Sequence, residues 1–180
     1  MPRWNVDPEH TVAEFTVRHM MVSWVHGQFN GCSGTIVFDP ADMANASVEA
    51  EIETAGLYTG VGRRDNHLKS ADFFDVEKFP KITFKSTRVE VAALNQLKAF
   101  GDLTIHGVTR EVVLDVLLAG PSSFFDDDEK KSYTTYGFRA TTDVNREDFG
   151  LKWNLEIDNG GFMVGKHIQL VVNVEADLID

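Results

Sequence analysis

The stretch Ile168-Gln169-Leu170-Val171-Val172-Asn173-Val174-Glu175-Ala176-Asp177-Leu178 alternates between apolar and polar side chains. Its even-numbered positions are all apolar, and its odd-numbered positions are polar apart from Val171. Successive side chains of a β-strand point to opposite faces. The pattern therefore predicts a strand that turns one face toward an apolar interior and the other toward water.

The same alternation recurs along the chain, joined mostly by short connections. It is clear in residues 13–17, 48–53, 97–105, 112–118 and 136–141. Residues 25–38 and 81–91 are also strand-like, but their alternation changes phase, and the glycines of residues 31–34 suit a bulge in the first of them. His106-Gly107 predicts a two-residue hairpin turn. About eight or nine strands of this kind are typical of an all-β protein with an antiparallel barrel or sandwich.

Three segments interrupt the strand pattern. Residues 57–70 predict one short helix, and residues 145–148 predict a second, with Asn145 as its cap. The acidic run within residues 121–131 predicts a solvated hairpin tip. Because no linker or repeat divides the chain, we expect one domain over residues 1–180.

Charge and composition exclude several classes of protein. The formal net charge of −11 disfavours nucleic acid and anionic membrane surfaces as partners. No apolar run approaches the roughly 20 residues of a membrane span. Cys32 is the single cysteine and cannot form an internal disulfide. The first residues do not resemble a secretion signal, so we expect a cytoplasmic protein, or a periplasmic one if such a signal was removed.

Catalytic and metal-binding motifs are absent from the sequence. None of the six histidines forms a metal-ligand spacing with another, so no metal site is predicted. No nucleophile motif is present, and no catalytic residue is assigned. The densest polar cluster, residues 63–75, is interpreted as ion pairs and caps that lock a loop over one end of the barrel. The chain is not expected to be an enzyme.

Phenylalanine is abundant, with 13 copies, and several lie outside the predicted strands. A barrel of this size has an interior wide enough for one ligand. The phenylalanines would then line the interior and its mouth. A filled core with aromatic plugs explains the same composition, and the sequence leaves both readings open.

The chain resembles the YceI family, polyisoprenoid-binding proteins with a lipocalin-like barrel. The resemblance rests on an ordered set of segments that runs almost from end to end: residues 4–20, 25–29, 64–75, 79–86, 101–110 and 145–150, and the closing strand after Val164-Gly165. Thr11, Gly56-Leu57 and Lys166 depart from the residues usual in the family. The family implies an apolar pore that holds a long isoprenoid or a similar amphiphile, and no established catalytic residues.

From this resemblance we expect a carrier or sequestering protein for a polyisoprenoid, an isoprenoid quinone or a fatty-acid-like lipid. No cofactor is expected besides such a lipid. If the protein forms an oligomer, we expect a homodimer. The alternatives are an enzyme that uses His19, His67 or an aspartate for proton transfer, and a stress-response module with a packed barrel. The expected pore residues are Phe15, Val17, Met20, Phe29, Phe38, Phe73, Phe74, Phe84, Leu103, Ile105, Phe138, Phe149, Phe162 and Met163.

The polar residues expected at the mouth have two competing roles. They are Arg63, Arg64, Asp65, His67 and Lys69. Arg64, Asp65 and His67, with Asp72, are interpreted mainly as a frame that holds the loop of Phe73 and Phe74. In the alternative, Arg63 or Lys69 meets an anionic head group such as a pyrophosphate.

Overall fold

The alternating stretch near the carboxyl end forms strand β11 (Val164–Ile179), which pairs with three other strands. The structure is a computed structural model that describes residues 1–158 and 160–179. On one edge β11 pairs with β10 (Lys131–Asn145), from Asn145↔His167 to Thr135↔Asp177. On its other edge it pairs with β2 (Val12–His19) and then with β1 (Arg3–Val6). The even-numbered side chains Ile168, Leu170, Val172 and Val174 face the interior of the barrel.

The remaining elements complete one antiparallel sheet with little helix. The other strands are β3 (Ser23–Phe29), β4 (Cys32–Val37), β5 (Ser47–Glu53), β6 (Leu57–Tyr58), β7 (Lys81–Ala93), β8 (Gln96–Ile105) and β9 (Val108–Asp126). The described residues hold one α-helix, α1 (Gly62–Lys69), and the 3-10 helices η1 (Met43–Asn45), η2 (Thr54–Gly56) and η3 (Arg146–Phe149). The expected all-β class with short helices is confirmed.

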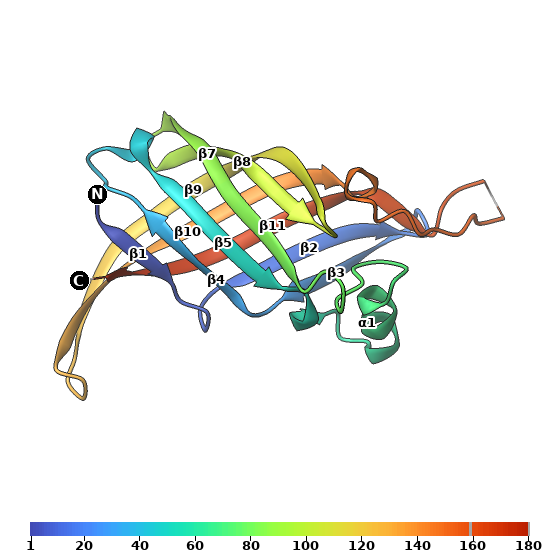
Figure 1. The fold of residues 1–180 in the computed structure, drawn as a ribbon, viewed down its shortest axis with the longest axis horizontal. Helices are drawn as coiled ribbons and strands as arrows, with labels where there is room; N and C mark the ends of the chain where they lie inside the picture. The colour runs from blue at the N-terminus through green and yellow to red at the C-terminus, as the bar shows by residue number, and fades with distance from the viewer. Residues whose placement is uncertain (159, 180) are drawn as a thin grey trace.

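The sheet closes into a barrel (Figure 1). Within the described residues, eight strands form the ring in the order β1-β4-β5-β7-β8-β9-β10-β11, and the pairing of β11 with β1 closes it. Strands β2, β3 and β6 continue from β11 on the same edge as β1. The antiparallel lipocalin-like barrel is therefore confirmed. The chain ends lie at one end of the barrel and α1 lies at the other.

Residues 25–38 form two strands with different neighbours, not one bulged strand. Strand β3 pairs with β2 and β6, whereas β4 pairs with β1 and β5. Gly31 separates them with a φ of 76°, a left-handed conformation that favours glycine. The change of phase in the sequence thus marks a change of strand partners.

The helical and turn segments largely follow their sequence signals. In residues 57–70, helix α1 forms only over Gly62–Lys69, because Leu57 and Tyr58 pair with β3 as strand β6. Asn145 caps η3, and its side chain accepts a hydrogen bond from the backbone N–H of Glu147 at 3.0 Å. His106 and Gly107 both have positive φ, as the predicted two-residue turn requires. The β9–β10 hairpin projects beyond the barrel, with residues 121–131 near its tip (Figure 1).

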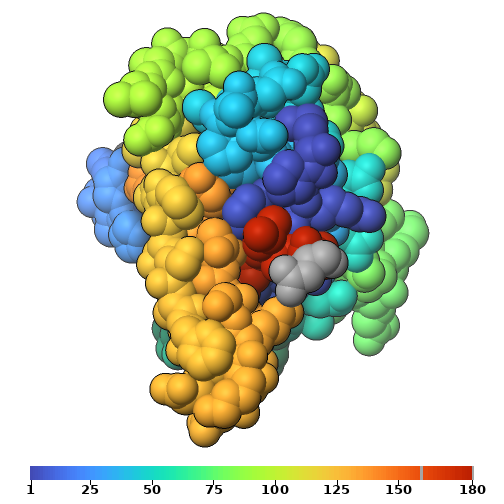
Figure 2. All heavy atoms as spheres, turned by 90° about the vertical axis from the view of Figure 1, so that its left-hand side faces the viewer, coloured from blue at the N-terminus to red at the C-terminus, as the bar shows by residue number. Residues whose placement is uncertain are grey.

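An aromatic cluster closes the end of the barrel that holds the termini. Trp4, Phe38, Tyr136 and Phe138 pack with ring centroids 5.1–6.5 Å apart, and the Trp4 Nε1–H donates to the backbone oxygen of Phe38 at 3.0 Å. Phe38 is only 1% exposed. Figure 2 shows this end filled, with the amino-terminal and carboxyl-terminal segments side by side. Any entrance therefore lies elsewhere.

Candidate ligand cavity

The barrel encloses an apolar cavity of about 260 Å³. Every strand of the ring contributes inward-facing side chains. Strand β2 adds Ala13, Phe15 and Val17, and the segment that follows α1 adds Phe73 and Phe74. Much of the lining comes from the inward phase of the long strands: Leu97, Ala99, Leu103, Ile105, Leu114, Val116, Phe138, Ala140, Val144, Ile168, Leu170, Val172 and Val174.

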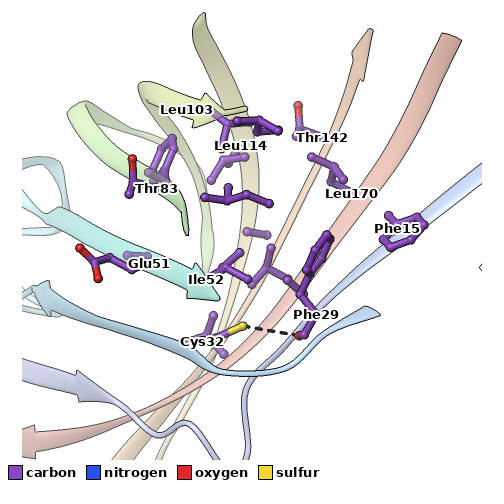
Figure 3. A pocket seen from close by; sticks show the side chains of 18 of the residues that line it. Phe15, Phe29, Cys32, Glu51, Ile52, Thr83, Leu103, Leu114, Thr142 and Leu170 are labelled. Atoms are coloured by element: carbon purple, nitrogen blue, oxygen red, sulfur yellow. Dashed lines mark hydrogen bonds between the residues drawn. The ribbon is translucent and has the colours of Figure 1, made fainter. Parts of the chain in front are cut away.

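Apolar side chains from opposite walls converge on this space (Figure 3). Phe29, Ile52, Leu114 and Leu170 come from four different strands and surround the same volume. The carboxylate of Glu51 points away from that group. A concave site of this composition binds hydrophobic molecules with few polar contacts.

Cys32 presents a thiol to the same space. Its Sγ donates to the backbone oxygen of Phe29 at 3.8 Å, and the residue is 4% exposed. Burial raises the pKa of this thiol above its ordinary value. The side chain therefore behaves as a small apolar group of the wall.

Two glycines make room for aromatic rings in the wall. Phe15 pairs across the sheet with Gly27, and a Cβ on Gly27 would lie 2.2 Å from the ring. A Cβ on Gly101 would lie 2.6 Å from the ring of Phe84 in the neighbouring strand. The small residues thus lie opposite the rings that cover them, which sets how far each ring reaches into the cavity.

Eleven of the residues expected in the pore line the cavity: Phe15, Val17, Phe29, Phe38, Phe73, Phe74, Phe84, Leu103, Ile105, Phe138 and Phe149. Their placement follows from strand alternation and, for Phe73 and Phe74, from the segment after α1. Phe29 contacts both the strand residues and the segment after α1, because its ring centroid lies 5.7 Å from that of Phe15 and 5.2 Å from that of Phe74.

Met20, Phe162 and Met163 are not brought to the cavity. Met20 has a φ of 48° and is 40% exposed, because it lies in the turn between β2 and β3 rather than in a strand. Phe162 is 43% exposed and bridges to Glu156. The backbone oxygen of Met163 accepts a hydrogen bond from Met20 N–H at 2.8 Å, outside the lining. These side chains lie in connecting segments, where alternation does not predict direction.

The polar residues of α1 form hydrogen bonds with the loop that precedes the helix. Buried Asp65 accepts a hydrogen bond from Thr59 N–H at 2.9 Å and from the Thr59 hydroxyl. Arg64 donates to Thr59 Oγ1 at 2.7 Å and to Thr59 O at 2.9 Å. These hydrogen bonds hold α1 against the loop before it, as expected of the polar frame.

His67 connects the frame to the aromatic cover of the cavity. Its Nε2 lies 2.9 Å from an Asp72 carboxylate oxygen. Its ring lies edge-on to Phe73 and Trp153, at centroid distances of 5.1 and 4.7 Å. Arg63 is exposed and Lys69 half-buried, and neither is among the lining residues.

Several lining residues were not predicted, and Arg146 is the most informative. Leu68 and Leu151 line the cavity from segments with no strand pattern. Arg146 lines it as well and is only 4% exposed. It lies two residues beyond Val144 and continues the inward phase of β10. The alternation of side chains along this strand therefore predicts that Arg146 faces inward.

Potential metal ligands do not gather in the described parts of the chain. Across residues 1–158 and 160–179, no group of three His, Cys, Asp or Glu side chains is placed to hold a metal ion. Over the same residues, no helix is long and apolar enough to cross a bilayer.

Comparison with known proteins gives the same architecture. A UPF0312 protein of Staphylococcus aureus (strain N315) is 34% identical over 97% of both chains. A UPF0312 protein of Pseudomonas syringae pv. tomato is 35% identical over 80% of this chain and 72% of its own length. Among solved structures, the YceI protein of Campylobacter jejuni aligns with a TM-score of 0.69 and 29% identity over 91% of this chain and 90% of its own.

Two more distant structures share the fold. BcnA of Burkholderia cenocepacia aligns with a TM-score of 0.80 and 24% identity, covering 94% of this chain and 98% of BcnA. A polyisoprenoid binding domain from Saccharophagus degradans, implicated in plant cell wall breakdown, aligns with a TM-score of 0.70 and 12% identity over 99% and 100% of the two chains. The model of the YceI-like domain matches residues 4–176, so this chain belongs to the YceI-like family.

Proposed function

We propose that the protein binds the tail of a long-chain amphiphile, a polyisoprenoid or an isoprenoid quinone, inside its barrel and carries or sequesters it. The observation that supports this most directly is the apolar cavity of about 260 Å³ inside the barrel. Moving an alkyl chain out of water contributes about 0.8 kcal/mol per CH₂ group. A long tail therefore supplies ample affinity without a dense set of polar contacts.

The family membership and its relatives support the same ligand class. A structural neighbour that shares the barrel architecture is a polyisoprenoid binding domain. A packed barrel, the structural-module alternative, does not agree with the cavity. The homodimer stays a prediction.

We also propose that the role is binding without catalysis. The enzyme alternative needs a histidine or an aspartate beside the ligand for proton transfer, yet His19, His67 and the aspartates of the described residues are absent from the cavity lining. The His67 ring is instead held between Asp72, Phe73 and Trp153. A structural role for His67 predicts that His67→Ala leaves ligand occupancy and every assayed conversion unchanged.

A series of prenyl alcohols of increasing length tests the proposed function. Geraniol, farnesol and geranylgeraniol share a head group and differ in tail, so their affinities isolate tail burial. We expect a one-to-one complex in native mass spectrometry and affinity that rises steeply with tail length until the cavity is filled. Failure to bind any member, or equal affinity along the series, contradicts the proposal.

A further inference from the structure

The cavity contains a buried positive charge that tail binding alone does not use. Of the charged residues that line the cavity, Glu14 and Glu51 are exposed to solvent, whereas Arg146 is 4% exposed. Its neighbours in the lining include Phe149 and Leu151. The wall is therefore apolar around a fixed cation.

Backbone oxygens hold the guanidinium. Its Nε donates to Gly165 O at 2.8 Å, one terminal nitrogen donates to Leu151 O, and the other lies 3.3 Å from Val164 O. Within residues 1–158 and 160–179, no acidic side chain forms an ion pair with it. The adjacent Glu147 instead pairs with Lys166 at 3.0 Å.

Two consequences follow from this arrangement. A guanidinium has five N–H donors, so three contacts leave donors for a further acceptor. Burying a charge is unfavourable, and burial lowers the pKa of Arg146; the nearby charge of Glu147 offsets this effect only in part. An anion that enters the cavity would take up the free donors and offset the charge.

Resting on the proposed function, we propose that Arg146 receives the head group of the bound amphiphile, and that this head group is an oxyanion, a carboxylate or a phosphate. The tail then extends from η3 along the barrel toward the aromatic cluster at the termini. Arg63 and Lys69, which lie outside the lining, do not determine head-group preference.

Tail-matched ligands separate head-group recognition from tail burial. The probes are geranylgeraniol, geranylgeranoic acid and geranylgeranyl monophosphate, titrated into the unmodified protein, Arg146→Gln and Arg139→Gln. Arg139 lies on the same strand in the outward phase and is exposed, so its variant removes the same charge outside the cavity. We expect the acid or the phosphate to bind about tenfold more tightly than the alcohol, as charge-assisted hydrogen bonds require.

The variants assign that preference to a residue. It should persist in Arg139→Gln and fall below about twofold in Arg146→Gln, with the affinity for the alcohol retained. Comparison of the acid with the phosphate shows which oxyanion fits. Equal binding of all three probes to the unmodified protein, or a preference that survives in Arg146→Gln, overturns the inference while leaving tail binding intact. Binding of none contradicts the proposed function itself.

A second measurement needs no variant and decides the matter if Arg146→Gln does not fold. The carboxyl pKa of bound, carboxyl-¹³C-labelled geranylgeranoic acid is followed by NMR in the unmodified protein. A nearby guanidinium lowers this pKa below the ordinary carboxyl value, whereas burial among apolar groups raises it. We expect the lowered value, and an unshifted or raised value overturns the inference.

Discussion

Asp65 is the buried carboxylate that ties α1 to the segment after β6. It accepts from both the N–H and the hydroxyl of Thr59, and its position in the first turn of α1 places it at the positive end of the helix dipole. The sequence predicted this frame because the polar residues were dense and of both signs. It did not identify Thr59 as the shared partner.

Substitution of Asp65 by alanine should destabilise the fold. Removing the acceptor leaves two donors of Thr59 without a partner, which costs about 1–3 kcal/mol. Urea unfolding of Asp65→Ala measures this loss. Asn66→Ala, at an exposed position in the same helix, is the control and should change stability little. Equal losses in the two variants would show that the Asp65 contacts contribute nothing specific.

The pair of Asp7 and His10 makes stability depend on pH. Their side chains lie 2.6 Å apart, and this hydrogen bond raises the pKa of His10 and lowers that of Asp7. The His10 contribution is present below about pH 6.5 and is lost as the pH rises through its raised pKa. The Asp7 contribution is present above its ordinary pKa and is lost as the pH falls through its lowered one.

The pair therefore stabilises the fold in a window around pH 5. Urea unfolding at pH 5 and pH 8 should show a larger difference between the unmodified protein and His10→Ala at the lower pH. The effect is small, since the His10 side chain is exposed to solvent. A difference that is the same at both pH values contradicts the assignment.

Among the elements, the long strands could be predicted and the change of partners at Gly31 could not. Alternation is a local property and marks β8, β9, β10 and β11 correctly. In residues 25–38 the alternation of apolar and polar side chains changes phase. A bulge and a change of strand partners both produce this pattern. Which occurs depends on the strand partners, and two of these, β1 beside β4 and β6 beside β3, are distant in sequence.

The β9–β10 hairpin beyond the barrel should be dispensable for the fold. Residues 123–134 are mostly exposed and extend past the ring of strands (Figure 1). Replacing them by Asn-Gly keeps a two-residue hairpin turn. We expect the thermal midpoint to change by only a few degrees and the affinity for geranylgeraniol to be unchanged. A large loss of either would show that the arm supports the barrel.

At the scale of the whole molecule, the sequence predicted which side chains face inward but not whether they meet. The diameter of a barrel depends on strand number and stagger, and these are set by pairings between distant segments. The hollow interior therefore became evident only from the structure. The inward position of Arg146 could be predicted, because it extends the inward phase of β10. That no acidic side chain within residues 1–158 and 160–179 forms an ion pair with Arg146 could not be predicted.

If the tail lies inside the barrel, a substitution that fills the cavity must prevent its binding. Ala140 lines the cavity, and Thr141 is the next residue in the outward phase of the same strand. Native mass spectrometry of folded Ala140→Trp and Thr141→Trp with geranylgeraniol compares a filled cavity with a matched external change. We expect a one-to-one complex for Thr141→Trp and none for Ala140→Trp. Equal occupancy in the two variants would show that the tail does not lie inside the barrel.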